Sequence, residues 1–352
     1  MDSAATADEA KTSAPAAVQP EPLPARILIR SSNWLGDAVM TVPAVRAIKL
    51  TRPDAHVTVL TRAKLADFWK IVPEVDAVIS CGEREGVFSV SRKIRSGFDM
   101  AVVFPNSVRS ALEVWLARIP RRAGNPGKHR SWLLTSIFAG GLNAGPPRHQ
   151  MLHYLDLAEF AGAKIDESMR RPESALRAGP RPAPAAGDSA KMKIGLCPGA
   201  EYGRAKRWLP ERFAEAVNAV SKRRECEWML FGTTRDARVG GEIAAKLEAS
   251  FTNLIGKTTL AELIAALSEC RLLLTNDTGT MHLAAFLGIP TVALFGSTEP
   301  ALTGPLGPGN RVLRHHVECS PCFLRECPLD FRCMNAITTD EVVEAVLRIL
   351  EP

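Results

Sequence analysis

Polar residues between positions 271 and 298 follow a pattern that could bind an anion. Arg271 to Thr275 is predicted to be a buried strand, and the turn Asn276-Asp277-Thr278-Gly279 leads into a helix from Thr280 to Leu287. Free backbone N–H groups at the start of that helix would favour a phosphate, as would its dipole, and His282 could add a donor. The alternative is a structural role, in which Asp277 caps the helix and His282 packs in the core.

Two further charged residues lie in loops that could face the same ligand. Asp37 follows the loop Ser31 to Gly36 after the first strand, and its carboxylate could act as a general base or simply cap the next helix. Lys206 lies in the long loop Pro198 to Pro210, from which a cation could reach phosphates held beside Asp277. Taken alone, a lysine in a loop is usually only solvated. The dinucleotide fingerprint and the P-loop pattern are both absent, which argues against a dehydrogenase and against a P-loop NTPase.

Four cysteines near the end of the chain form a third candidate site. Cys319, Cys322, Cys327 and Cys333 have the spacing C-x2-C-x4-C-x5-C, and four thiols so close together suit a tetrahedral structural Zn²⁺. The spacing is not the paired arrangement of a typical zinc ribbon, so a packed loop with free thiols is an equal alternative.

A regular alternation of strands and helices must position these residues. Short apolar strands alternate with amphipathic helices in both halves of the chain. The strands are predicted at 26–30, 56–60, 77–80, 100–104, 193–197, 227–231, 253–255, 271–275 and 291–295. This rhythm is typical of parallel sheets covered by helices on both faces. The predicted fold class is therefore α/β, with two Rossmann-like domains facing a central cleft, where such folds bind ligands.

Composition marks the limits of these domains. Residues 1–24 have almost no large apolar side chain and are predicted to be a disordered tail. Residues 25–171 form the first domain, the Pro- and Ala-rich segment 172–190 a linker, residues 191–337 the second domain, and 338–352 a C-terminal helix. The start of the chain does not have the pattern of a secretory signal, and no apolar run approaches the length of a membrane span. We therefore expect a cytoplasmic protein with reduced cysteines.

Positive charge is concentrated in the first half of the chain. The formal net charge is +6 over 352 residues. Residues 26–177 carry 23 Lys and Arg against 14 Asp and Glu, an excess of 9, so the remainder is slightly acidic. Such an excess suits an anionic partner, namely nucleic acid, an acidic membrane surface or an anionic glycolipid, although a solvated surface is the commoner explanation. The main contributors form two clusters, which are Arg92, Lys93 and Arg95, and Arg121, Arg122, Lys128 and Arg130.

Five segments together resemble one known family. They are SSNWLGDAVMTVPAVRAIK, CPGAEYGRAKRWLPERFAEAV, FGTTRD, NLIGKTTLAELIAALSECRLLLTNDTGTMHLAAFLGIPTVALFGSTEP and CSPCFLRECP. In this order they resemble the lipopolysaccharide heptosyltransferases, over nearly the whole chain from Arg26 to Leu350, and the first loop is closest to the heptosyltransferase II branch. The resemblance implies a GT-B fold and an inverting glycosyl transfer that needs no metal cofactor.

The resemblance also implies the substrates and the site residues. The donor would be ADP-heptose, and the acceptor the first inner-core heptose of heptosyl-Kdo₂-lipid A. Asp37 would be the general base, and Lys206 would stabilise the departing ADP. The residues implied in donor binding are Gly199, Thr233, Asp277, Thr278, Gly279 and His282. Among them Asp277 would hold the loop or a sugar hydroxyl, because a carboxylate aimed at pyrophosphate would be repelled.

Location and partners follow from the same resemblance. The first domain would hold the acceptor, and its two basic clusters would bind the cytoplasmic face of the inner membrane peripherally, with no nucleic acid involved. Two alternatives remain open. One is a related heptosyltransferase of type I or III with another acceptor or sugar nucleotide. The other is a non-catalytic protein that binds a sugar nucleotide, although the presence of both Asp37 and Lys206 favours the enzyme.

Overall fold

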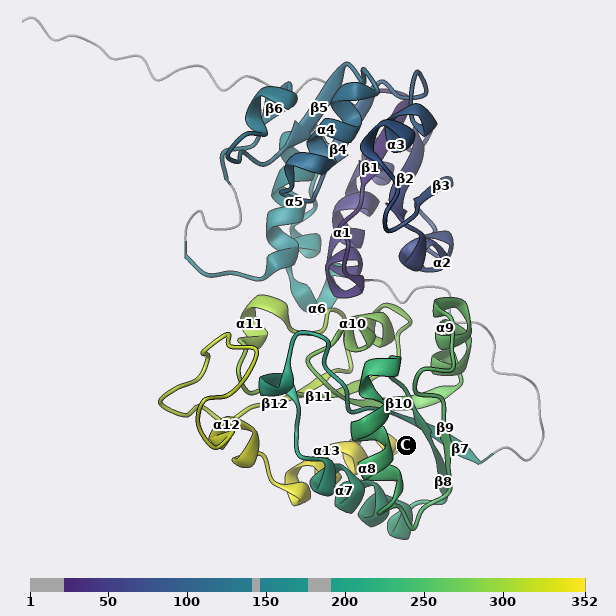
Figure 1. Cartoon of the computed structure of the whole chain (residues 1–352), viewed down its shortest axis with the longest axis vertical. Coiled ribbons are helices and arrows are strands. Elements are labelled where there is room, and N and C mark those ends of the chain that lie inside the picture. Colours follow the sequence, from purple (N-terminus) through teal and green to yellow (C-terminus); the bar gives the residue numbers. More distant parts are fainter. Residues whose placement is uncertain (1–21, 141–145, 177–190, 352) are drawn as a thin grey trace, which may run out of the picture.

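Two parallel α/β domains lie one above the other in the computed structural model (Figure 1), which describes residues 22–140, 146–176 and 191–351. Each contains a six-stranded sheet. Most of the predicted tail and linker lies outside the described residues. Leu23, at the end of the predicted tail, is buried, and the first four linker residues form the short helix α6 (Pro172–Ala175). In the described residues, no helix is long and apolar enough to cross a membrane.

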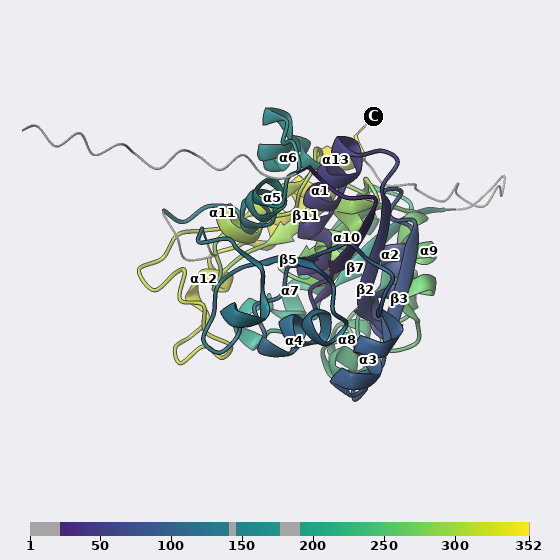
Figure 2. The same cartoon turned by 90° about the horizontal axis from the view of Figure 1, so that it is seen from above.

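The first domain has the strand order β3-β2-β1-β4-β5-β6, with every pair parallel. Ile27 and Ile29 of β1 pack with α1 and α5 on one face, and Leu28 packs with α3 and α4 on the other. The two views agree on this placement (Figures 1 and 2). The bounds are β1 Arg26–Arg30, α1 Leu35–Thr51, β2 His56–Arg62, α2 Ala66–Lys70, β3 Ala77–Cys81, α3 Val87–Lys93, β4 Met100–Val103, α4 Val108–Leu116, β5 Arg121–Gly124, β6 Ser136–Ile137 and α5 Gln150–Phe160.

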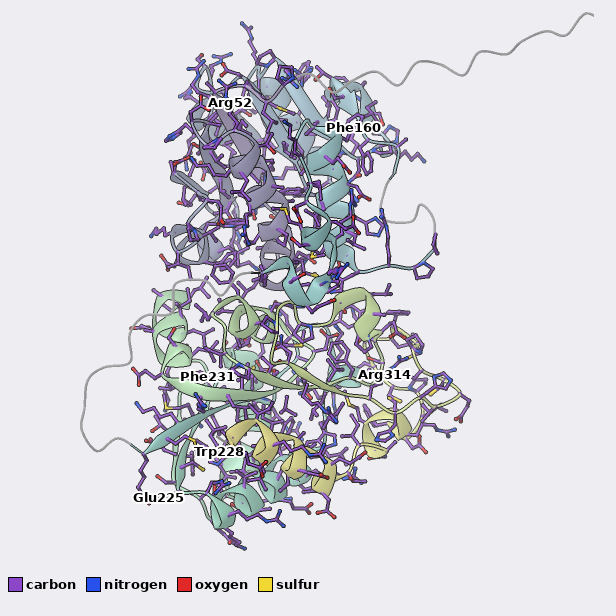
Figure 3. The ribbon with its side chains drawn as sticks, turned by 180° about the vertical axis from the view of Figure 1, so that it is seen from behind. Arg52, Phe160, Glu225, Trp228, Phe231 and Arg314 are labelled. Atoms are coloured by element: carbon purple, nitrogen blue, oxygen red, sulfur yellow. The ribbon has the colours of Figure 1, made fainter. Side chains whose placement is uncertain are left out.

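The second domain has the strand order β12-β11-β10-β7-β8-β9, again all parallel. Trp228 and Phe231, on β8 and just after it, are buried inside this domain (Figure 3). The bounds are β7 Met192–Cys197, α7 Pro210–Arg223, β8 Cys226–Leu230, α8 Ala237–Ala244, β9 Phe251–Asn253, α9 Leu260–Ser268, β10 Cys270–Asn276, α10 Gly279–Phe286, β11 Thr291–Leu294, α11 Pro300–Thr303, β12 Arg311–Leu313, α12 Arg332–Asn335 and α13 Thr339–Leu350.

The last helix belongs to the core of the second domain. Thr338 and Glu341 form a capping box at the start of α13, and the helix packs its apolar residues, including Val342 and Val346, with those of α7. The apolar face of the last helix therefore serves packing within the second domain.

Several edge elements were not predicted. The strand β5 begins with Arg121 and Arg122, and it has neither the apolar run nor the alternation that signals a strand. The strands β6 and β12 have two and three residues, which is too short for a periodic pattern. All three lie at or next to a sheet edge, where neighbouring strands rather than side-chain pattern fix the pairing.

Candidate functional site

The two domains meet where the first helices after their central strands face each other. A Cβ added to Gly36, in the first turn of α1, would lie 2.8 Å from Cδ2 of His282 in α10. A Cβ on Gly279, the first residue of α10, would lie 3.1 Å from Cβ of Leu35. Glycine at both positions therefore permits the close approach of the two helix starts. Since each helix follows the carboxyl end of a parallel strand, the junction is the place where this fold class binds ligands.

Asp37 lies in the first turn of α1 and does not cap it. The N-cap residue is Trp34, so the capping alternative for Asp37 is wrong. Its Oδ1 accepts a hydrogen bond of 3.1 Å from Nε2 of Gln150, which also donates to the hydroxyl of Tyr154. Burial raises the pKa of Asp37, and the bond from Gln150 and the charge of Lys206 oppose that rise. A half-buried carboxylate whose proton affinity is raised in this way suits proton abstraction.

Lys206 forms a buried ion pair with Asp277. The distance from Nζ to Oδ2 is 2.5 Å, and the exposed fractions of the two side chains are 14% and 4%. The same Oδ2 accepts from the hydroxyl of Thr298 at 2.7 Å, and Nζ lies 4.9 Å from the ring centroid of Tyr202. Asp277 therefore ties the loop that contains Lys206 to the start of α10, and its predicted contact with a sugar hydroxyl stays a prediction. Its helix-capping alternative is wrong, because Thr278 is the N-cap residue of α10.

A hollow of about 420 Å³ lies beside this ion pair and is lined by both domains. Four of the predicted donor-binding residues line it, namely Gly199, Thr233, Thr278 and Gly279. The first turn of α10 contributes Thr280 as well, so N–H groups without a partner inside the helix lie at its wall. The lining does not include three other predicted site residues, namely Lys206, Asp277 and His282.

Some residues of this hollow were missed by the sequence reasoning. Lys64 reaches it from the first domain, and Asp236 contributes a carboxylate whose Cγ would be only 2.4 Å from a Cβ on Gly199. Asp236 bonds the backbone N and hydroxyl of Thr233 and accepts from Arg207, so it organises the wall. The Thr233-x-x-Asp236 spacing is a capping-box signal that could have been read from the sequence.

His282 is buried and neutral near pH 7. It is 4% exposed, and its Nδ1 has no hydrogen-bond partner within the described part of the chain. Burial lowers the pKa of His282 to about 4, with Asp277 acting in the opposite direction. At neutral pH this side chain can therefore donate through one ring N–H, but it carries no positive charge for a phosphate.

Acid should destabilise the protein through His282. Its folded pKa lies below its ordinary value of 6.5, so the unfolded chain binds the extra proton first as pH falls. About 3 kcal/mol of stability is expected to be present above pH 6.5 and to be lost towards pH 4. Burial also lowers the pKa of His149 and His153, so the wild-type loss is larger still. Thermal unfolding of His282→Asn, followed over this range, should show a shallower fall in midpoint than wild type. An unchanged slope would contradict the assignment.

The predicted basic clusters do not form one continuous surface. Arg130 is fully buried and donates to Oδ1 of Asn106 at 3.2 Å, so its assignment to a membrane surface is wrong. Arg121 donates to the carbonyl of Pro22, and Arg122 donates to the carbonyls of Leu133 and Ile119. In contrast, Arg92, Lys93, Arg95 and Lys128 are exposed.

The four clustered cysteines are all free thiols. Burial raises the pKa of Cys333, and its neighbours Cys319, Cys322 and Cys327 act in the same direction, so the loop does gather them. Among the described residues, however, no group of three or more His, Cys, Asp or Glu is placed to hold a metal ion. The four thiols are therefore gathered in one loop without the arrangement of a formed metal site, and the choice between zinc and free thiols stays a prediction.

This arrangement has counterparts among known proteins. The sequence model of glycosyltransferase family 9 (heptosyltransferase) matches residues 87–331. Lipopolysaccharide heptosyltransferase 2 of Salmonella typhimurium is 32% identical over 306 residues, which cover 82% of this chain and 88% of that protein. The solved structure of Escherichia coli ADP-heptose lipopolysaccharide heptosyltransferase II is 28% identical, with a TM-score of 0.75 over 92% of this chain and 98% of that chain.

A second solved structure is similar in fold alone. The E. coli heptosyltransferase WaaC, solved with ADP-2-deoxy-2-fluoro heptose, is 16% identical, with a TM-score of 0.67 over 92% of this chain and 99% of that chain. Together with the two parallel sheets, these structural neighbours confirm the predicted α/β fold of the GT-B type.

Proposed function

This chain belongs to glycosyltransferase family 9, the heptosyltransferases, and from that premise we propose that it transfers L-glycero-D-manno-heptose from ADP-heptose to the first inner-core heptose of heptosyl-Kdo₂-lipid A. Its broader activity, heptosyl transfer in synthesis of the lipopolysaccharide core, is that of the family members it resembles. The observation that carries the proposal is the position of Asp37, a half-buried carboxylate at the junction with the anion-favouring start of α10.

The chemistry proposed at this junction is a single inverting displacement. Asp37 accepts the proton of the acceptor hydroxyl as its oxygen bonds to the anomeric carbon of the donor. The bond from that carbon to the phosphate oxygen breaks on the opposite side, and ADP leaves with the electron pair. Gln150 orients the carboxylate through its hydrogen bond to Oδ1. Inversion follows because only one displacement occurs at the anomeric carbon.

Donor binding is proposed in the hollow beside α10. Its volume of about 420 Å³ lies in the range of small-molecule sites. The N–H groups at Thr278 to Thr280 and the helix dipole would face the pyrophosphate, with the cation of Lys206 close behind. We propose that these groups compensate the charge of ADP without a metal, so turnover should be unchanged by a chelator. WaaC, whose fold is similar, was solved with an ADP-sugar, which is the class of ligand proposed here.

Acceptor binding is proposed at the carboxyl edge of the first sheet. Asn106 and Asn125 follow β4 and β5 there, and Oδ1 of Asn106 accepts from Asn125 and from Arg130. The Nε and Nη2 atoms of Arg130 lack a partner in the described residues. Burial lowers the pKa of Arg130 to about 10. Because Arg130 is fully buried, we propose that it acts on the acceptor through Asn106, whose side chain it holds in place. The proposed location is the cytoplasmic face of the inner membrane, where such an acceptor is anchored.

One assay tests the reaction and separates the alternatives. The protein is incubated with ADP-heptose and either heptosylated or heptose-free Kdo₂-lipid A, and products are identified by mass spectrometry. Addition of one heptose to the heptosylated acceptor alone is expected. Transfer to the heptose-free acceptor would instead indicate a type I enzyme. Binding of ADP-heptose with no transfer to either acceptor would indicate a non-catalytic protein.

A further inference from the structure

The outer side of the first domain carries an apolar stripe that no other described element covers. Val108 and Trp115 lie two turns apart on one face of α4, and their exposed fractions are 40% and 39%. Trp132, which is 65% exposed, makes an edge-to-face contact with Trp115 at 5.6 Å between ring centroids. Phe88 on the neighbouring helix α3 is 78% exposed. The solvent face of a helix in a soluble domain is normally polar, so this stripe suits a partner surface.

Arginines surround the stripe. A groove of about 520 Å³ beside Trp115 is lined by Arg95, Arg118 and Arg122. Arg95 and Arg118 are exposed, and neither forms an ion pair within the described ranges. Arg122 is half-buried and donates to backbone carbonyls, so it shapes the groove. Arg92 is exposed on α3, four residues after Phe88, and so shares its side of the helix.

Acidic residues do not cancel this charge. The helix α3 contains none, and the single one in α4, Glu113, is fully buried in ion pairs with Arg30 and Arg109. Figures 1 and 2 show α3 and α4 side by side on the same face of the first domain, while α1 and α5 cover the opposite face. The stripe and the free arginines therefore form one amphipathic surface.

We propose that α3, α4 and the turn Ser131–Leu133 form a docking surface for an anionic lipid bilayer. In this surface Trp115, Trp132 and Phe88 enter the interface between head groups and acyl chains, and Arg95 and Arg118 bind head-group phosphates. Tryptophan favours that interface because its ring is apolar and its N–H is polar, and arginine binds phosphate with paired donors. This inference rests on the proposed function, because a lipid-anchored acceptor brings the enzyme to such a surface.

The aromatic residues change the expected response to salt. Binding through arginines alone would disappear at high ionic strength, because exposed charges are screened. Binding that also buries aromatic rings should weaken with salt but persist in part. The composition of this surface differs from the predicted basic clusters. Arg130 is buried and does not belong to it, whereas Arg118, which was not predicted, does.

Sedimentation of the full chain with vesicles tests the surface. The vesicles contain phosphatidylglycerol and phosphatidylcholine in equal amounts, or phosphatidylcholine alone. Trp115→Ser/Trp132→Ser should lower binding to the anionic vesicles by about tenfold or more at low and at high salt. Arg95→Gln/Arg118→Gln should lower binding about tenfold at low salt only. Wild type should bind phosphatidylcholine vesicles weakly.

Matched controls come from other faces of the chain. Phe160→Ser replaces an aromatic residue of similar exposure on α5, visible from behind in Figure 3, and Arg238→Gln replaces an exposed arginine of the second domain. Neither should change vesicle binding. Each variant is also assayed for heptose transfer to a delipidated, water-soluble acceptor, which the surface variants should modify at the wild-type rate.

Three results would overturn the inference. The first is that the tryptophan variant binds anionic vesicles as strongly as the wild-type protein does. The second is that the wild-type protein binds neutral and anionic vesicles equally. The third is that the surface variants lose activity on the soluble acceptor. Failure of the proposed function would look different. The wild-type enzyme would then modify no acceptor, soluble or lipid-bound, while vesicle binding and its loss in the two surface variants would persist.

Discussion

Asp37→Asn is expected to lower turnover by about 10²-fold or more, the range for loss of a general base, with ADP affinity little changed. Asparagine keeps an oxygen that can accept the bond from Gln150, so the local geometry should survive. The side chain does not line the hollow beside α10, which is the reason for an unchanged donor affinity. Initial rates give the turnover, and calorimetry gives the affinity for ADP.

Two companion variants make this result specific. Asp67→Asn changes an exposed carboxylate on α2 and should leave turnover unchanged. Gln150→Leu removes a bond that holds the pKa of Asp37 down, so the acid limb of the pH–rate profile should move to higher pH. Because burial already raises this pKa, that limb should lie above the ordinary aspartate range even in the wild type. If Asp37→Asn kept near-wild-type turnover, Asp37 would not be the general base, and its role would be to hold the side chain of Gln150.

Lys206→Ala is expected to weaken ADP binding by about 10²-fold or more. Breaking a buried ion pair costs about 3–5 kcal/mol when the remaining charge is left uncompensated. In this variant the carboxylate of Asp277 would keep only the hydroxyl of Thr298 as a partner and would repel the pyrophosphate. Turnover should fall as well, since the departing ADP would lose the cation beside the start of α10. Calorimetry with ADP and single-turnover rates measure the two effects.

The double variant Lys206→Ala/Asp277→Asn shows how much of the loss in ADP affinity comes from the unpaired carboxylate and how much from the missing lysine side chain. Removing the orphaned carboxylate should restore part of the lost ADP affinity. Lys222→Ala, which removes an exposed lysine of α7, should have no effect. His282→Asn should weaken ADP binding less than Lys206→Ala, because His282 supports the wall of the hollow from behind. Unchanged ADP affinity in both the Lys206 and the His282 variants would refute the placement of the donor.

The fold was predictable because each central strand is a short apolar run that can be recognised from neighbouring residues alone. The apolar runs of β1, β7 and β10 can be recognised without any tertiary information, and so can the turn chemistry after β10. The partners of the site residues could not be predicted in the same way. Gln150 is 113 residues from Asp37, and Lys206 is 71 residues from Asp277, so only the packed domains bring them together.

Burial of charge was the least predictable property. Arg130 and Lys128 look alike in the sequence, yet Arg130 is buried beside Asn106 whereas Lys128 is exposed. A count of basic residues measures the electrostatic field around a domain, but it does not show which side chains face solvent. The same applies to the cysteine loop, where spacing brings thiols near each other without fixing their mutual angles.

The ion pair between Lys206 and Asp277 also has a consequence for entropy. A free lysine side chain has about 2 kcal/mol of rotamer entropy, and a ligand that immobilises it must overcome that loss. Here Asp277 and the ring of Tyr202 fix the ammonium group when the chain folds. Ordering of the cation is therefore complete before any nucleotide arrives, and binding loses no further freedom at this position. Affinity for an anion beside α10 should thus depend on electrostatics and shape, with little contribution from the flexibility of the lysine.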